Sequence, residues 1–307
     1  MTRQDGDGRP YRGGMGADRS AFGAFLRARR DRLTPGQAGI EAFPGPRRVP
    51  GLRREELAML AGLSTDHYSR LEQGRQATVS ESVLAALTRA LRLNEVEAAH
   101  LRDLAAPASR ARRTAPEVQH PDPGLLRLAA TLDHVPVLLL GRRAEVLAHN
   151  ALLRAVLGRA PALGSSFTHY LFRDPLARER IVNWAAFGAR SVAAMRREAG
   201  RRPEDRRLMA EVDDLRRTDP DVARWWDDHT VRDYASVAKR IAHPEAGLLD
   251  FHIEIVTAPH APDQHLVVYT AEPGSSTARM LPLLASWAAP ADTPTGPRDR
   301  PRDRPRD

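Results

Sequence analysis

The segment REELAMLAGLSTDHYSRLEQGR, residues 54–75, constrains the fold of this chain more than any other. Leu57 and Ala61 lie one helical turn apart, as on the apolar face of an amphipathic helix. Gly62 can adopt the left-handed conformation that a sharp turn needs, and Ser64 can cap a second helix through its hydroxyl. The segment therefore predicts two short helices joined by a tight turn.

The second predicted helix has an apolar face and a polar face. Tyr68 and Leu71 would point inward. Short hydrogen-bonding groups and one guanidinium would point outward, from Thr65, Asp66, His67, Ser69 and Arg70. Because any helical hairpin needs a small turn residue and buried leucines, this spacing alone also fits a purely structural hairpin.

The ordered string L-A-x-x-A-G-L-S, followed by R-L-E-x-G, resembles the helix-turn-helix of phage-repressor (XRE) type, in which the second helix lies in the major groove. The resemblance implies an all-α, lambda-repressor-like domain of five helices. Thr78 and Glu81 are spaced as a capping box for the fourth helix, and Asn94 and Glu97 for the fifth.

The resemblance also implies roles for individual residues. Thr65, Asp66 and Arg70 occupy base-reading positions, and Arg54 occupies a position near the phosphate backbone. Ser64, His67 and Ser69 complete the expected DNA-facing set. Arg30 and Glu72 stand where the family commonly has a structural ion pair.

One departure from the usual pattern is a loop of about twenty residues between the first and second helices. Its end carries a cluster of arginines, namely Arg47, Arg48, Arg53 and Arg54. These side chains would approach DNA beside the second helix, so they are candidates for contact with the phosphate backbone. A solvated basic loop is an equally good interpretation.

Charge and composition narrow the function classes. The chain has 307 residues, a formal charge of +8 and a pI of about 10.7, which favour an anionic partner. Residues 1–113 hold 20 basic against 13 acidic residues, so they carry most of the excess. The chain has no cysteine, no signal-peptide pattern and no apolar run of membrane-spanning length. We expect a soluble, cytoplasmic protein that does not bind membranes.

Composition shifts predict two domains between unstructured ends. Lys239 is the only lysine among 47 basic residues, which we attribute to the coding bias of a high-GC bacterium rather than to function. The predicted organisation is a disordered start at 1–17, a helix-turn-helix domain at 18–106, a proline-rich linker at 107–123, a second domain at 124–276, and a helical end with a disordered Pro-Arg-Asp tail at 277–307.

The second domain is predicted to be α+β. The stretch PVLLLGRRAEVLAHN reads as two strands around a turn at 141–143, and three more strand-like runs follow several helices. This order indicates one antiparallel sheet with helices inserted between its halves. The segments HNALLRAVLG, HPEAGLLDFHIEI and VVYTAEPGS resemble the actinobacterial MmyB-like regulators. The resemblance implies a PAS-like domain with a five-stranded antiparallel sheet, helices over one face, and a small apolar, fatty-acid-like ligand between them.

Aromatic and apolar residues on the predicted helices are candidates for the pocket lining. They are Trp184, Phe187, Val192, Met195, Trp225 and Trp226. Residues of this kind at helical spacing more often form plain core, so both interpretations remain open.

No catalytic motif is present, and we expect no enzyme activity, cofactor or metal. Asp227, Asp228 and His229 are adjacent and would point in different directions, which favours a solvated or capping cluster over a metal site. The sequence therefore indicates a DNA-binding transcription regulator that binds double-stranded DNA as a homodimer. The alternatives are a second domain that is only a docking or dimerisation scaffold, or a cofactor-dependent enzyme or redox sensor.

Overall fold

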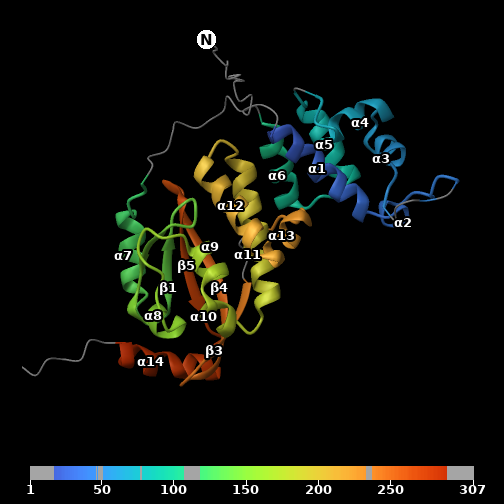
Figure 1. Cartoon of the computed structure of the whole chain (residues 1–307). Coiled ribbons are helices and arrows are strands. Elements are labelled where there is room, and N and C mark those ends of the chain that lie inside the picture. The colour runs from blue at the N-terminus through green and yellow to red at the C-terminus, as the bar shows by residue number, and fades with distance from the viewer. Residues whose placement is uncertain are drawn as a thin grey trace, which may run out of the picture.

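The computed structural model describes residues 17–45, 47, 51–76, 78–106, 118–232 and 237–288 (Figure 1). The N-terminal part is entirely helical. Its elements are α1 (Ala17–Arg32), α2 (Pro35–Ala38), α3 (Arg54–Ala61), α4 (Thr65–Glu72), α5 (Glu81–Ala90) and α6 (Glu95–Ala105). The five predicted helices are α1 and α3 to α6, and α2 is a single turn within the long loop.

Helix ends in this part follow local sequence with one exception. Asn94 and Glu97 form the predicted capping box of α6. The predicted cap of α5 at Thr78 is wrong, because Ser80 accepts the hydrogen bond from the backbone N–H of Val83. Both positions carry hydroxyl residues, and the helix begins at the later one.

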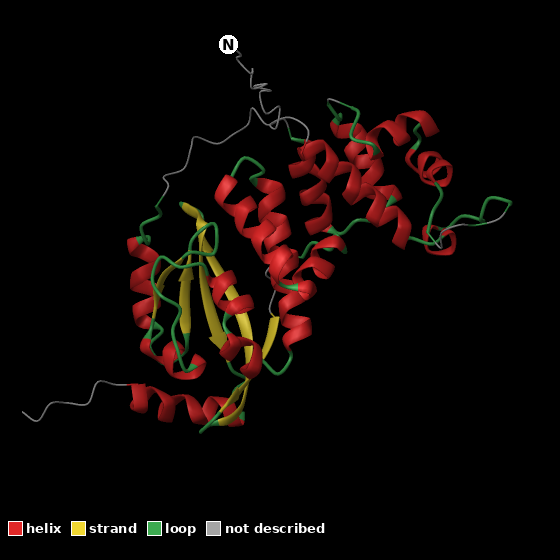
Figure 2. Ribbon diagram, viewed as in Figure 1, coloured by secondary structure: helices red, strands yellow, loops and turns green. Residues whose placement is uncertain are grey.

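The C-terminal part is α+β, as Figure 2 shows. Its sheet contains β1 (Val137–Leu140), β2 (Val146–His149), β3 (Val237–His243), β4 (Gly247–Ala258) and β5 (Ala261–Thr270), in the order β2-β1-β5-β4-β3 with every neighbour antiparallel. Its helices are α7 (Pro123–Thr131), α8 (Ala151–Leu157), α9 (Phe167–Arg173), α10 (Pro175–Arg180), α11 (Trp184–Arg201), α12 (Arg206–Thr218), α13 (Pro220–Asp227) and α14 (Ser276–Ala288). This is the predicted five-stranded antiparallel sheet.

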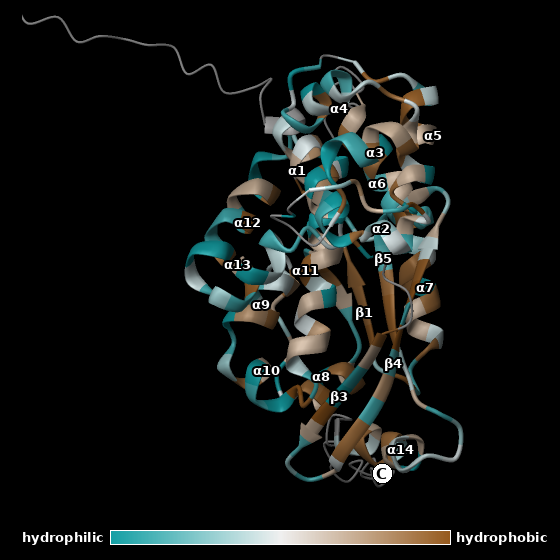
Figure 3. Cartoon of the chain, turned by 90° about the vertical axis from the view of Figure 1, so that its right-hand side faces the viewer, coloured by the Kyte–Doolittle hydropathy of each residue, from teal (hydrophilic) through white to brown (hydrophobic). Residues whose placement is uncertain are grey.

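The two faces of the sheet have separate cores. One face packs against α8 to α13 through Leu138, Phe251 and Tyr269, which belong to the largest buried cluster. The other face packs against α7 through Leu139 and Leu125. The helices therefore do not all cover one face, because α7 takes the opposite one. In Figure 3 the central strands β1 and β5 are mostly apolar, whereas the outer helices α12 and α13 are mostly polar.

The helical and α+β parts touch along two elements. Helix α11 packs against α6, where Gly200 faces His100 so closely that an added Cβ would lie 2.4 Å from the imidazole Cε1. Val231, just after α13, is buried in the N-terminal core. The two parts therefore share packed surface rather than only a covalent connection.

Candidate nucleic-acid interface and ligand pocket

The turn between α3 and α4 has the geometry that the sequence predicts. Gly62 has a φ of +65°, a left-handed conformation that favours glycine. Its N–H donates to the carbonyl of Met59, and the N–H of Leu63 donates to that of Ala58. The hydroxyl of Ser64 then accepts from the backbone N–H of His67 at 3.1 Å and so caps α4.

Helix α4 has one buried and one exposed face. Tyr68 and Leu71 are almost completely buried. Of the residues predicted to face DNA, four are exposed and two are half-buried: Ser64, Thr65, Asp66 and Arg70, and then His67 and Ser69. The exposed groups on one short helix include a carboxylate acceptor and a guanidinium donor, which are the groups that read base edges in the major groove.

A buried ion-pair network supports α4 from behind. The guanidinium of Arg30 donates to both carboxylate oxygens of Glu72, at 2.9 and 3.2 Å, and to the carbonyl of Leu52. Arg54 donates to the same carboxylate at 2.9 Å. Burial alone would raise the pKa of Glu72, but the hydrogen bonds from the two arginines outweigh it and hold the pKa below its usual value. The predicted Arg30–Glu72 pair is confirmed.

The arginines of the long loop are engaged within the protein. Arg47 donates to Gly51 and pairs with the buried carboxylate of Glu56. Arg53 donates to two loop carbonyls. Arg48, the remaining loop candidate, lies outside the described residues. The guanidinium groups of Arg47 and Arg53 therefore fix the loop against α3, whatever contact they make with DNA.

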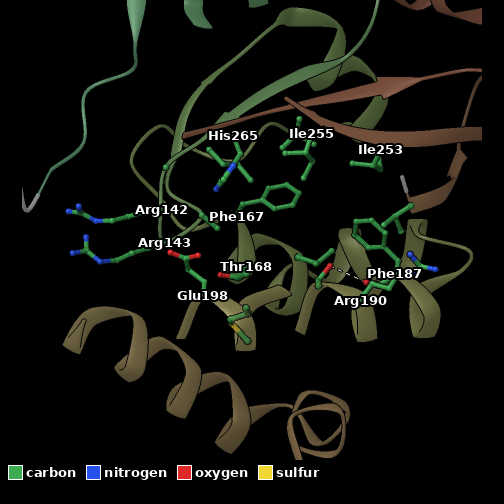
Figure 4. Close-up of a pocket in the computed structure, with 18 of the residues that line it drawn as sticks. Arg142, Arg143, Phe167, Thr168, Phe187, Arg190, Glu198, Ile253, Ile255 and His265 are labelled. Atoms are coloured by element: carbon green, nitrogen blue, oxygen red, sulfur yellow. Dashed lines mark hydrogen bonds between the residues drawn. The ribbon is translucent and has the colours of Figure 1, made fainter. Parts of the chain in front are cut away.

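A pocket lies between the sheet and the helices that cover it. It is lined mainly by apolar side chains from α9, α11, β4 and β5, together with the β1–β2 turn. In Figure 4, Arg142, Arg143 and Glu198 lie at one end of this pocket, whereas Phe187 and Ile253 lie at the other. The first end is the more polar one, although Arg190 lies beside Phe187 at the second, and the mainly apolar lining between them suits an elongated apolar molecule.

The predicted pocket residues fall in different places. Phe187 and Met195 line the pocket. Val192 is fully buried in the core, and the ring of Trp184 packs edge-on against Phe172. Trp225 contacts Gly188, and Trp226 lies under the guanidinium of Arg196, 4.3 Å from the guanidinium carbon to the ring centroid. These last four do not line this pocket.

Most lining residues were missing from the sequence prediction, because they come from strands and turns. Ile253, Ile255, Val267 and Tyr269 supply the sheet side of the pocket. They alternate along β4 and β5 with residues on the other face, as strand geometry requires. That alternation is visible in the sequence and could have identified them.

The polar end of the pocket is held by ion pairs. The Nε atom of Arg143 lies 2.7 Å from a carboxylate oxygen of Asp205 at the start of α12, and its Nη1 atom lies 3.0 Å from Glu145. His265 lines the same end, and burial lowers the pKa of its imidazole. The β1–β2 turn is thus tied to α12 across the pocket entrance.

Besides α11 and α6, the contact between the two parts of the chain joins α1 to the residues that follow α13. Arg29 donates to the carbonyl of His229 at 3.0 Å, and Arg32 pairs with the carboxylate of Asp228. Burial, aided by the neighbouring guanidinium of Arg196, lowers the pKa of His100 to about 3. The histidine is therefore neutral in this junction at neutral pH.

The described ranges contain neither a helix suited to span a membrane nor a cluster of metal ligands. In that part of the chain no helix has both the length and the apolarity to cross a bilayer. In the same residues no three histidine or acidic side chains are grouped as metal ligands. Asp228 and His229 instead contact α1, and Asp227 pairs with Arg216 of α12.

Comparison with known families agrees with this architecture. The family described as MmyB-like transcription regulator ligand binding domain matches residues 121–284, more than half of the chain. A helix-turn-helix domain family matches residues 21–101, which include α3 and α4. A search of curated proteins gave no significant match. The chain therefore belongs to the family of MmyB-like regulators and is a DNA-binding transcription regulator with a separate ligand-binding domain.

Proposed function

We propose that this regulator binds a small apolar molecule in the pocket between sheet and helices, and that occupancy of the pocket changes its affinity for DNA. The observation that carries the proposal is the position of α11. Phe187, Ser191 and Met195 of this helix line the pocket, while Gly200 near its end packs on α6 of the DNA-binding domain. One helix therefore contacts both functional regions.

Close packing at that contact supports coupling between the two regions. Gly200 leaves no room for a side chain against His100, so a shift of α11 must displace α6 or open the junction. The arginine contacts from α1 to Asp228 and His229 would change with it. Ligand and DNA would then alter each other's affinity reciprocally.

The exposed residues of α4 define the proposed DNA contact. Arg70 can grip guanine O6 and N7 through two hydrogen bonds, and Asp66 can accept from cytosine N4, so we infer a half-site that contains G·C pairs. One such helix reads only a few base pairs. We therefore infer a homodimer on a repeated half-site, with the dimer contact supplied by the second domain.

Selection of DNA from a random pool by the purified chain tests the first part. Arg70→Ala should weaken binding to the selected site by about 1–3 kcal/mol and relax its sequence preference, whereas Arg48→Ala should weaken all sequences alike. Arg127→Ala, an exposed arginine on α7, is the matched control. Equal losses on selected and scrambled duplexes for Arg70→Ala would contradict base reading.

Thermal unfolding with decanol, an apolar chain with a small polar end, tests the pocket. A molecule that binds only the folded state raises the melting temperature by mass action. Ser191→Trp, which fills the pocket, should abolish that rise and any effect of decanol on DNA affinity, yet still bind DNA. A wild-type chain that shows no response to decanol or related amphiphiles, with Ser191→Trp clearly destabilised, would indicate a filled scaffold instead.

A further inference from the structure

The chain's only lysine is buried beside the pocket. Lys239 lies on β3 with its side chain completely inaccessible to solvent, on the same strand face as Val237, which lines the pocket. Its Nζ atom donates one hydrogen bond, of 3.1 Å, to the hydroxyl of Tyr269. Only its rarity marks this amine in the sequence, but the alternation of positions 237, 239 and 241 along the strand places it in the core.

Three aromatic rings surround the amine. Its nitrogen lies 4.7 Å from the centroid of the Phe187 ring, 5.2 Å from that of Tyr269 and 5.6 Å from that of Phe167. All three rings line the pocket. The amine therefore lies directly behind the aromatic wall of the pocket, and contact with the pocket contents requires a change of ring rotamer.

No countercharge accompanies this amine. Among the described residues no carboxylate forms an ion pair with Lys239, and burial is the cause that lowers its pKa, to about 7. A large share of the folded chains therefore holds a neutral, nucleophilic amine at neutral pH, whereas an ordinary lysine is almost entirely protonated.

The neutral amine favours a carbonyl ligand over a carboxylate ligand. Bringing a carboxylate to Lys239 would bury two charges among aromatic rings, and the desolvation cost of such a pair can exceed its attraction. The pocket lining also includes Arg190, whose guanidinium is charged at any pH and suits an anion better than a neutral amine does. A neutral aldehyde or ketone reaches the amine without burying any charge.

We propose that Lys239 is a covalent anchor that holds an apolar aldehyde or ketone in the pocket as an imine. The inference rests on the proposed function, because it assumes that the pocket binds an apolar molecule. It adds the chemical class of that molecule's reactive group and the residue that fixes it.

The reaction needs no other reactant. The lone pair of the amine forms a C–N bond to the carbonyl carbon, and the π electrons of the carbonyl move to its oxygen. Both protons of the neutral amine pass to that oxygen, the C–O bond breaks, and water leaves, so that a C=N bond remains. Burial raises the pKa of Tyr269, whose hydroxyl therefore stays protonated and can donate a hydrogen bond to the carbonyl oxygen.

Reductive trapping on the full chain tests the anchor. The chain is incubated with decanal and sodium cyanoborohydride at neutral pH, and intact mass and peptide mapping locate the decyl group. Cyanoborohydride delivers hydride to the imine carbon, and the nitrogen takes a proton from water. Lys239 and the N-terminal amine are the only amines in the chain, so the assignment is unambiguous.

The matched control is the same reaction on the chain unfolded in urea. Unfolding returns the Lys239 pKa to its ordinary value, where only about a thousandth of the amine is neutral at neutral pH. We expect Lys239 in the folded chain to be labelled several hundredfold faster than in the unfolded chain, with the N-terminal amine similar in both. Lys239→Met should lose the internal label and keep the terminal one.

The remaining outcomes distinguish this inference from the proposed function. Slower labelling of Lys239 in the folded chain than in urea, with decanol still raising the melting temperature, overturns the covalent anchor and leaves the apolar pocket in place. Stabilisation by decanoate but not by decanal, lost in Lys239→Met, overturns the carbonyl class and makes the amine a counterion. Failure of decanal, decanol and decanoate alike overturns the anchor together with the apolar pocket.

Discussion

The two domains bury their cations in opposite ways. In the DNA-binding domain, Arg30 is almost completely buried and donates to Glu72 and to a backbone carbonyl. In the ligand-binding domain, Lys239 is completely buried, and among the described residues its amine donates only to the phenol of Tyr269. The protein itself supplies several hydrogen-bond acceptors for the Arg30 guanidinium. The Lys239 amine can form further hydrogen bonds, and it lies next to a pocket.

This difference assigns the two domains different physical tasks. A closed ion-pair network behind α4 costs desolvation energy but fixes the helix in one position, as reading base edges requires. An uncompensated amine in an apolar wall lowers the stability of the empty domain. A molecule that bonds the amine would restore that stability. The ligand domain should therefore be stabilised by such a molecule, whereas the network behind α4 holds the DNA-binding domain in one conformation without one.

The largest effect is expected from removing the shared carboxylate of the saturated network. Glu72→Ala leaves the buried guanidinium of Arg30 without its partner and should destabilise the helical domain by about 3–5 kcal/mol. Urea unfolding followed by circular dichroism measures the loss. Glu55→Ala, which removes an exposed carboxylate 3.4 Å from Arg53, is the control and should change little. Similar losses for both variants would contradict the claim that the buried network stabilises the DNA-binding domain.

A change of the opposite sign is expected from the uncompensated amine. Lys239→Met should stabilise the ligand domain by about 1–4 kcal/mol at low pH, because a buried charge is replaced by an apolar group of similar length. Tryptophan fluorescence isolates this domain, since all four tryptophans lie beyond residue 183. Destabilisation at every pH would show that the three rings and the phenol already compensate the amine.

The advantage of Lys239→Met should also depend on pH. The folded pKa of about 7 lies below the 10.5 of an ordinary lysine, so the unfolded chain binds more protons between these values. The free energy of unfolding of the wild-type chain therefore rises as pH increases from about 7 toward 10. Below pH 7 the amine is charged in both states, so the whole cost of burying that charge lowers the stability. The difference between the variant and wild type should shrink across that window.

A smaller effect is expected from the hydrogen bond between the amine and Tyr269. Tyr269→Phe should destabilise the ligand domain by about 1–2 kcal/mol, because it removes the one partner that the amine has in the described part of the chain. The same change in the Lys239→Met background should cost clearly less. Additive effects in this double-mutant cycle would mean that the phenol stabilises the domain independently of Lys239. Tyr170→Phe on α9, a half-buried tyrosine, serves as the control.

The smallest effect on stability is expected from the outer arginine of the network. The side chain of Arg54 is 41% exposed, and Arg30 still pairs with Glu72 after Arg54→Ala. The free energy of unfolding should therefore change by less than about 1 kcal/mol. DNA affinity should nevertheless fall for every sequence, if the guanidinium also contacts phosphate. A large loss of stability would show that Arg30 alone does not compensate the buried carboxylate of Glu72.

Local sequence signals predicted the DNA-binding domain well, because its structure depends on local rules. The left-handed Gly62, the cap at Ser64 and the buried Tyr68 each follow from their neighbours within a few residues. The error at Thr78 arose where two hydroxyl residues compete for one cap, and Ser80 took it. The contact of Asp228 with α1 was not predictable, because it joins segments about two hundred residues apart.

The pocket was harder to predict because it depends on how a sheet and a helix meet. Helical spacing located Phe187 and Met195 but could not tell them from Val192, which is buried in the core of the same helix. Rotation of α11 about its axis decides which residues face the sheet, and that rotation is set by tertiary packing. Lys239 was visible as a rarity, yet only its three ring neighbours indicate a role.

The sole lysine has a further consequence for the outer surface. Every basic side chain outside the core is an arginine or a histidine, so apart from the N-terminus no surface cation carries a primary amine. Acylation, which neutralises lysine, has no side chain to act on at the DNA-facing surface, and guanidinium groups keep their charge at any pH a cell reaches. The guanidinium charge that attracts DNA therefore depends neither on lysine acylation nor on cellular pH.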